Sequence, residues 1–219
     1  MGPIAITLIM LAAAAAFALL AWRKLSIVAR LQPEVRWDRP LARLAKVGRL
    51  GLMQSRMIAM EPFAGLVHTA IFLGFLILLV RKLQLVVIGY VPNYTFPGLA
   101  GGLYATLKDA VEVVVVVAVV VALWRRLVLR PARFEPNREA LVVLSLILAI
   151  MLTDLAFDGF RFALLAASDP GLAHERSFAF VGAAIASALD ALPAATLETG
   201  MHATYWIQIL TVFAFLVLL

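Results

Sequence analysis

Five long apolar stretches dominate the chain and limit it to one class of fold. They cover residues 3–22, 62–90, 103–124, 138–167 and 198–219 of the 219-residue sequence. An α-helix rises about 1.5 Å per residue, so about 20 apolar residues cross a hydrocarbon core of about 30 Å. Because lipid offers no partners for backbone N–H and C=O groups, each stretch is expected to be helical. The sequence therefore predicts an all-α integral membrane bundle of five transmembrane helices.

The composition excludes several kinds of site. The sequence is 64% hydrophobic and 15% charged, and it contains no cysteine. Without cysteine, these residues can form no disulfide, zinc–thiolate site or cysteine-ligated iron–sulfur cluster. A redox cofactor bound within the chain would therefore depend on histidine, of which there are three. The stretch 3–22 has no basic residue before it, unlike a cleavable signal peptide, so we expect it to be retained as the first span.

Basic residues are unevenly distributed among the connecting segments. Nine lysine and arginine residues lie in 23–61 and five in 125–139, against one in 168–200. Because cytoplasmic loops of membrane proteins carry the excess of Lys and Arg, we expect the N-terminus outside and the C-terminus in the cytoplasm. Within the basic loop 23–61, apolar and basic residues follow helical spacing after Pro40. This pattern indicates an amphipathic helix that either lies on anionic headgroups or docks a cytoplasmic electron-transfer partner.

A single histidine interrupts the second apolar stretch. In EPFAGLVHTAIFLGF, His68 is expected about 10 Å inside the cytoplasmic boundary. One interpretation is a histidine that is hydrogen-bonded to a neighbouring helix. The other is an axial haem ligand, because a neutral imidazole binds iron strongly and Gly65 and Gly74 could leave room for a flat porphyrin. Small residues also serve ordinary helix packing, so the glycines do not decide between the two.

A second group of polar residues is expected near the outer side of the membrane. Lys108, Asp109 and Glu112 should lie about 8 to 14 Å below the outer boundary. A central charge costs roughly 2.5 to 3.5 kcal/mol in a membrane helix, so such side chains are either paired or functional. They could form a self-neutralising set of ion pairs, or Glu112 could exchange protons with a quinone headgroup whose carbonyl Lys108 binds. The other charges expected in this region are Arg81, Lys82, Asp154, Asp158 and Arg161.

The remaining histidines lie on the outer side. His202 begins the last stretch and is separated from His68 by on the order of 15 Å along the membrane normal, so the two cannot ligate one iron. It is therefore only a weak candidate metal ligand, and His174 is expected to be solvated in the outer loop. The partner of His68 is therefore either missing from this chain or located past Leu219. FAFLVLL ends without a helix cap, so we expect the native chain to continue.

Four segments resemble one known family. The segments are QSRMIAMEPFAGLVHTAIFLGF (54–75), LTDLAFDGFRFAL (152–164), FAFVGAAIASAL (178–189) and HATYWIQILTVFAFLVLL (202–219). Together they are similar to the five-helix membrane domain at the N-terminus of heterodisulfide-reductase-like iron–sulfur oxidoreductases. That domain is similar to the gamma subunit of respiratory nitrate reductase. The second-helix segment is the most specific of the four, and the first helix and the outer loops resemble the family least.

The resemblance implies an electron-transfer module with a b-type haem. His68 matches the axial histidine of the second helix, and the second ligand of the family pattern would follow Leu219. Gln208 stands where the family commonly has a histidine after paired aromatic residues, so a second haem is not expected. Electrons would pass between the quinone pool, menaquinone or ubiquinone, and iron–sulfur clusters held in an attached cytoplasmic domain or a separate subunit.

The same resemblance implies a setting for the chain. It would be the quinone-interacting part of a respiratory-chain oxidoreductase in the bacterial cytoplasmic membrane, with the lipid bilayer around it and no nucleic acid partner. Electron-transferring flavoprotein is one electron donor that enzymes of this family use. The basic surface of the cytoplasmic loops would position the iron–sulfur module.

Two alternatives remain open from the sequence. The quinone site could lie in the outer group with Lys108, Asp109, Glu112 and His202, or beside a haem at His68. The rival function is a non-redox membrane anchor, or a transporter component whose outer carboxylates bind a proton or cation. A transporter would more often show broken midplane helices or related halves, and neither is visible in the sequence.

Overall fold

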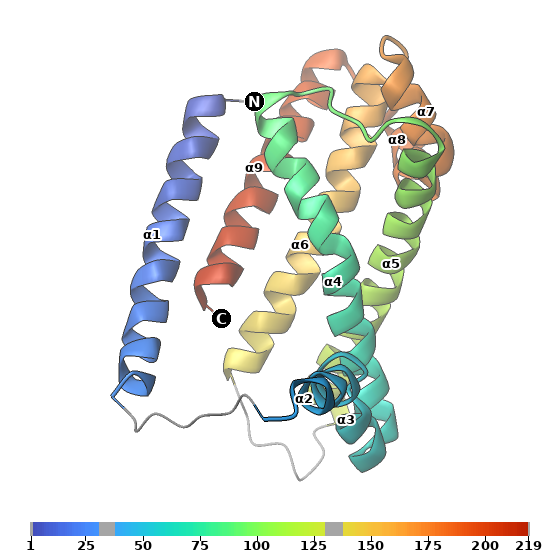
Figure 1. Ribbon diagram of the computed structural model, residues 1–219. Helices are drawn as coiled ribbons and strands as arrows, with labels where there is room; N and C mark the ends of the chain where they lie inside the picture. Colours follow the sequence, from blue (N-terminus) through green and yellow to red (C-terminus); the bar gives the residue numbers. More distant parts are fainter. Residues whose placement is uncertain (1, 31–37, 130–137, 219) are drawn as a thin grey trace.

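The structure is a computed structural model that describes residues 2–30, 38–129 and 138–218. These residues form helices joined by short connections, and they contain no strand, so the all-α class is confirmed (Figure 1). In chain order the elements are α1 (Pro3–Val28), α2 (Pro40–Val47), the π-helical turn η1 (Gly48–Leu52), α3 (Ser55–Met60), α4 (Pro62–Tyr90), α5 (Gly98–Trp124), the π-helical turn η2 (Arg125–Leu129), α6 (Arg138–Leu165), α7 (Pro170–Phe178), α8 (Phe180–Leu189) and α9 (Ala194–Leu218).

Four of these helices are long and apolar enough to cross a membrane. They are α1, α4, α6 and α9, with 26, 29, 28 and 25 residues. This is the architecture of a multi-pass membrane protein. The helix α5 is similarly long, at 27 residues, but it carries Lys108, Asp109 and Glu112 around its middle. The fifth span and the orientation of the bundle therefore stay predictions.

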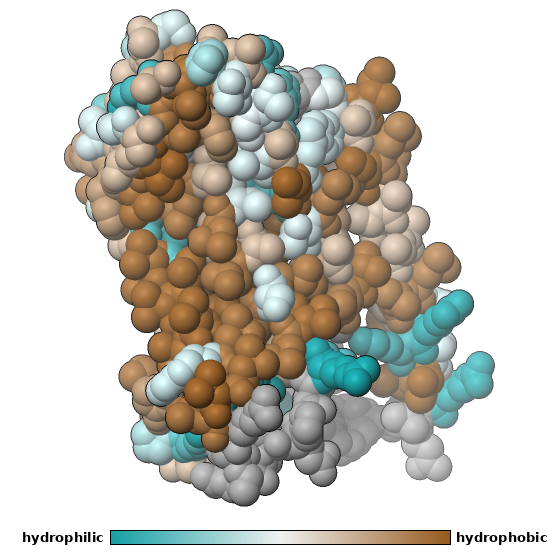
Figure 2. All heavy atoms as spheres, turned by 180° about the vertical axis from the view of Figure 1, so that it is seen from behind, coloured by the Kyte–Doolittle hydropathy of each residue, from teal (hydrophilic) through white to brown (hydrophobic). Residues whose placement is uncertain are grey.

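The helices surround α6, which packs against α5, α8 and α9. The short helices α7 and α8 cover one end of the bundle, and α2 and α3 lie at the opposite end (Figure 1). The first helix, α1, runs along the side of the bundle, where it packs on α9 and α4 and buries only Ile6 and Ala13. Apolar side chains cover the middle of the surface in Figure 2, as contact with lipid acyl chains requires.

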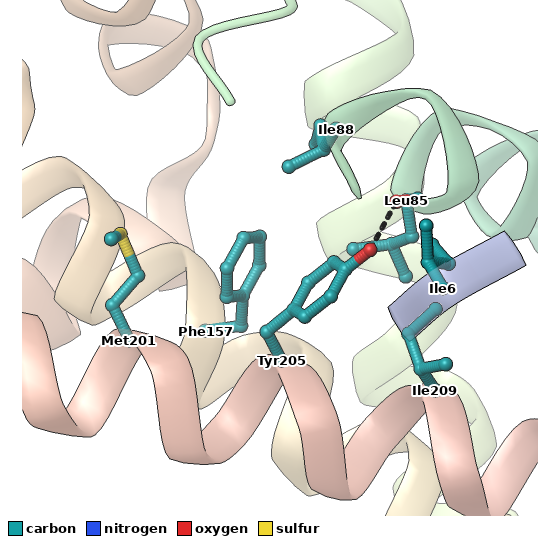
Figure 3. Packing of buried hydrophobic residues seen from close by; sticks show 7 residues of the cluster. All are labelled: Ile6, Leu85, Ile88, Phe157, Met201, Tyr205 and Ile209. Atoms are coloured by element: carbon teal, nitrogen blue, oxygen red, sulfur yellow. Dashed lines mark hydrogen bonds between the residues drawn. The ribbon is translucent and has the colours of Figure 1, made fainter. Parts of the chain in front are cut away.

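A cluster of apolar residues holds α1, α4, α6 and α9 together near the α7/α8 end. The hydroxyl of Tyr205 donates a hydrogen bond to the carbonyl oxygen of Leu85 across 3.1 Å (Figure 3). Gly89 permits this approach, because a Cβ at that position would collide with the Ile6 side chain and the Tyr205 hydroxyl. The cluster consists of Ile6, Leu85, Ile88, Phe157, Met201, Tyr205 and Ile209.

Local structure differs from the sequence prediction in two places. The first helix continues beyond residue 22 to Val28, through the basic residues that follow the apolar stretch. Between 168 and 199, the stretch FAFVGAAIASALDAL (178–192) predicts one short helix, which α8 confirms, and the structure adds a second short helix, α7, which ends before Ala179. Asp169 caps α7 by accepting hydrogen bonds from the backbone N–H groups of Gly171 and Leu172, at 2.8 and 3.1 Å.

Alanine substitutions at Gly89 and Gly48 should have opposite effects on the stability of the protein. Gly89→Ala should lower the free energy of unfolding by about 1–3 kcal/mol, because the added methyl group overpacks the contact between α1, α4 and α9. Gly48→Ala should raise it by up to about 1 kcal/mol, because Gly48 is helical and its Cβ would meet no neighbour. Thermal unfolding of both variants in detergent measures the difference in stability. Equal changes in the two variants would contradict the close packing at Gly89.

Candidate functional site

His68 lines a cavity of about 680 Å³ at the α2/α3 end of the bundle. This volume lies within the range of roughly 300–1,000 Å³ that is typical of small-molecule and cofactor sites. The walls come from α3, α4, the end of α5 with η2, and the start of α6, and they are mostly apolar. The lining residues with charged, imidazole or thioether side chains are Met57, Met60, Glu61, His68, Arg125, Arg126 and Glu139.

The helix α4 positions His68 less than two turns from its start. Glu61 has an extended backbone conformation, and Pro62 follows as the first residue of α4, so the chain turns sharply between α3 and α4. The imidazole is exposed. Within the part of the chain that the structure describes, no side chain forms a hydrogen bond with it. The structure therefore does not show the packing hydrogen bond that was one interpretation of His68, and the ring is available to a ligand.

The two glycines named with His68 serve close helix packing. A Cβ at Gly65 would lie 2.6 Å from the Cα of Ile58, so the glycine lets the backbone of α3 rest directly on α4. A Cβ at Gly74 would collide with the side chain of Val115 on α5. Gly65 also lines the cavity, whereas Gly74 lies outside its wall. Gly65 thus shapes the cavity by bringing α3 close, and Gly74 fixes the distance between α4 and α5.

Charged residues lie at the edge of the cavity. Arg125 forms an ion pair with Glu61, which ties the end of α5 to the turn between α3 and α4. Its guanidinium carbon also lies 5.7 Å from the ring centroid of Phe63. Arg126 lines the same cavity. Glu139 lines it as well, so two arginines and two glutamates lie at the edge of an otherwise apolar pocket, and the guanidinium groups are the side chains that can bind carboxylate groups of a ligand.

The lining residues fit a haem. They supply one imidazole, His68, and two thioether sulfurs, Met57 and Met60, which are the side-chain types that ligate haem iron in proteins. Apart from Glu61, Glu139 and the two arginines, the remaining wall is apolar, with valine, isoleucine, leucine, alanine and phenylalanine side chains. Sequence reasoning missed both methionines and both arginines. Met57 and Met60 are spaced one helical turn apart, which the sequence shows. The sequence does not show that α3 folds back onto α4 and so brings both side chains to the cavity.

The outer polar group forms a buried network between α4 and α6. The Arg81 guanidinium donates hydrogen bonds to Asp154 Oδ1 at 2.9 Å, to Gln84 Oε1 at 2.8 Å and to Asp158 Oδ1. Lys82 Nζ lies 2.6 Å from the second oxygen of Asp154. Arg81, Asp154 and Asp158 are all completely buried. One arginine on α4 is therefore paired with two carboxylates one turn apart on α6.

Lys108 extends this network to α5. Its ammonium group lies 2.7 Å from Asp158 Oδ2, 2.8 Å from Asp109 Oδ1 and 3.3 Å from Glu112 Oε2. Lys108, Asp109 and Glu112 are at most 1% exposed. The structure thus brings together the three residues that the sequence placed in one group, and it surrounds them with the charges of α4 and α6. These contacts match the first interpretation, a set of ion pairs. That a quinone binds at these residues stays a prediction.

Two further contacts join α7 and α8 to the network. Asp109 Oδ2 accepts hydrogen bonds from the backbone N–H groups of Val181 at 2.6 Å and Gly182 at 3.2 Å, so a side chain of α5 caps the start of α8. Arg161 donates to the carbonyl oxygen of Tyr94 at 2.7 Å and pairs with Glu175 of α7 at 3.5 Å. The charged residues therefore decide how the short helices sit on the bundle.

The structure does not bring the three histidines together. His202 is half-buried in the first half of α9, a helix that begins at the α7/α8 end, whereas His68 lies in the first two turns of α4, a helix that begins at the α2/α3 end (Figure 1). His174 is on α7, where its Nε2 lies 3.2 Å from the carbonyl oxygen of Gly98. Gln208 is fully buried, and its amide has no hydrogen-bond partner among the described residues. Those residues also contain no group of three or more His, Asp or Glu that could hold a metal ion.

No family model, no curated protein and no solved structure matches the chain. The candidate sites therefore rest on the chemistry of the residues themselves.

The network predicts a large effect for the loss of its central lysine. Lys108→Met should lower the free energy of unfolding by about 3–5 kcal/mol, because it leaves buried carboxylates without a counter-charge. The double variant Lys108→Met/Asp158→Asn should recover part of this loss. Unfolding in detergent measures both, with Lys46→Met on the exposed helix α2 as the control. A loss no greater than that of the control would show that the ion pairs do not hold the helices.

Proposed function

We propose that the chain is a membrane electron-transfer module that binds a b-type haem through His68. The observation that carries this proposal is an exposed imidazole, without a hydrogen-bond partner in the described residues, on the wall of an apolar cavity of about 680 Å³. Electrons would pass between a cytoplasmic iron–sulfur or flavoprotein partner and menaquinone or ubiquinone. The chain would then be the quinone-interacting part of a membrane-bound oxidoreductase.

The residues of the cavity have distinct tasks in this proposal. His68 would hold the haem iron, and the haem would supply the one-electron chemistry that the chain itself lacks. Arg125 and Arg126 would bind carboxylate groups at the edge of the cavity. The apolar side chains of α4, α5 and α6 would keep water away from the bound group, which is one means by which proteins set the potential of a redox centre.

The α2/α3 end is proposed to face the cytoplasm, in line with the basic segments that lie there. The helix α2 exposes Leu41 and Leu44 on its surface together with Arg43 and Lys46, a composition that suits the interface of a membrane with anionic lipids. The cavity lies at the same end. A cytoplasmic iron–sulfur domain or subunit would therefore dock at the end of the bundle that holds the haem.

We place the quinone beside the His68 cavity rather than at the outer network. Lys108, Asp109 and Glu112 are at most 1% exposed and already contact one another and Asp158, so a headgroup would have to displace buried ion pairs. The exposed face of His68, in contrast, lies on a helix that contacts lipid in the proposed orientation. A quinone that diffuses in the bilayer would reach it without crossing the packed helices.

A second candidate function has its own support in the structure. The buried network of α4, α5 and α6 is what a non-redox membrane anchor would need to fix its helices, or what a proton- or cation-coupled transporter would need to bind its ion. This candidate requires no cofactor in the His68 cavity. The two functions therefore differ in one observable, the presence of haem in the purified protein.

The haem proposal predicts a specific spectroscopic result. The reduced-minus-oxidised absorption spectrum of the purified protein should contain the bands of a b-type haem, and His68→Ala should lose them, because the ligand of the iron is removed. His202→Ala and His174→Ala are the matched controls and should keep the bands, since both histidines lie away from the cavity.

Two results would contradict this assignment. Absence of haem bands from the intact protein would favour the non-redox candidate. Unchanged bands in His68→Ala, together with a loss in His202→Ala, would move the haem to the other end of the bundle.

A further inference from the structure

The buried network contains one acidic group more than it has basic groups. Four basic side chains face five acidic ones, and the most exposed of the nine, Lys82, has a side chain that is 13% exposed. A buried charge without a counter-charge is costly, and a carboxylate in that position takes up a proton instead. One of the five acids is therefore expected to be neutral. The basic residues are Arg81, Lys82, Lys108 and Arg161, and the acidic residues are Asp109, Glu112, Asp154, Asp158 and Glu175.

Glu112 has the fewest polar contacts of the five acids. Among the described residues its only partner is Lys108, at 3.3 Å, and its Oε1 atom is buried and accepts no hydrogen bond. Each of the other network acids has at least two polar contacts, which for Glu175 are those with Gln84 and Arg161. Asp109 also accepts two backbone N–H groups, Asp154 contacts both basic residues of α4, and Asp158 contacts Arg81 and Lys108.

The surroundings of Glu112 leave it poorly compensated. Lys108, on its own helix, lies closer to Asp158 and Asp109 than to Glu112. The other charged groups that act on Glu112 are Arg81 and Lys82 of α4 and Asp154 of α6. Arg81 and Lys82 both pair with Asp154 already. The proton that the network requires therefore belongs on Glu112.

A line of polar groups connects Glu112 with the α7/α8 end of the bundle. Tyr104, Lys108 and Glu112 are spaced four residues apart, so they share one face of α5 and extend over about 12 Å. The Tyr104 hydroxyl and the Nε of Arg161 are buried without a hydrogen-bond partner in the described residues. Buried polar atoms of this kind usually bind water.

The line ends at a carboxylate near the surface. Glu175 is 7% exposed, and it contacts Gln84 Nε2 at 3.4 Å and Arg161 Nη1 at 3.5 Å. Gln84 in turn accepts a hydrogen bond from Arg81, which pairs with Asp158 and so leads back to Lys108. Glu175 is thus the group through which a proton from the α7/α8 side would enter.

We propose that Glu112 is a proton-exchange site inside the bundle, supplied from the α7/α8 side by way of Glu175. Hydronium transfers one proton to the Glu112 carboxylate, which becomes a carboxylic acid, and water is released. The exchange moves no electron. The inference therefore goes beyond the proposed electron transfer and holds whether or not the His68 cavity contains haem.

Infrared difference spectroscopy of the purified full chain in liposomes tests the site. Between low and high pH, the protein should show a carboxylic acid C=O band that decreases as the pH rises and shifts in D₂O. Glu112→Gln, which preserves the shape of the side chain, should lose this band. Glu198→Gln, at an exposed position on α9, is the matched control and should retain it.

A labelled sample of the unaltered protein provides a test that does not depend on how a variant folds. With ¹³C in the carboxyl groups of glutamate only, the band should shift, because Glu112 and not an aspartate carries the proton. Glu175→Gln should keep the band but slow its exchange with D₂O. The proposal is overturned if the unaltered protein has no pH-dependent acid band, if the glutamate label leaves the band unshifted, or if Glu112→Gln retains it.

Discussion

The pairing of Arg81 with Asp154 and Asp158 is the interaction on which the arrangement of the helices depends. Lipid-exposed helices gain little from the hydrophobic effect when they associate, so packing and polar contacts must define their positions. Arg81 joins α4 to α6, and Lys108 joins α5 to the same aspartate of α6. Asp109 then fixes the start of α8. One connected set of charges therefore determines how four helices meet.

The two ends of the bundle have different physical properties. At the α7/α8 end, charged side chains are buried, paired and held by short helices that exclude solvent. At the α2/α3 end, apolar walls surround a cavity with His68 on its side and arginines at its edge. The first end supplies rigidity and a site for a proton, and the second supplies space for a bound group. Under the two proposals, this separation would let electron transfer and proton exchange occupy different parts of one small bundle.

Hydropathy and charge predicted much of this molecule. Long apolar stretches identified the helices, and the cost of buried charge identified Lys108, Asp109 and Glu112 as residues that need partners. The partners themselves depend on how helices rotate against one another, which periodicity in nearly uniform apolar segments does not reveal. For the same reason the packing of Gly65 on α3 and of Gly74 on Val115 could not be foreseen. The division of 168–199 into α7 and α8 depends on the cap that Asp109 supplies from a distant part of the chain.

The haem content of the purified protein decides whether the His68 cavity holds a haem, as we propose. A pyridine haemochrome assay on the intact chain, expressed with an adequate haem supply, identifies the haem type and its ratio to protein. We expect b-type haem at a ratio of one per chain, since only His68 among the three histidines lies on the cavity. Protein that is folded and yet free of haem would contradict it.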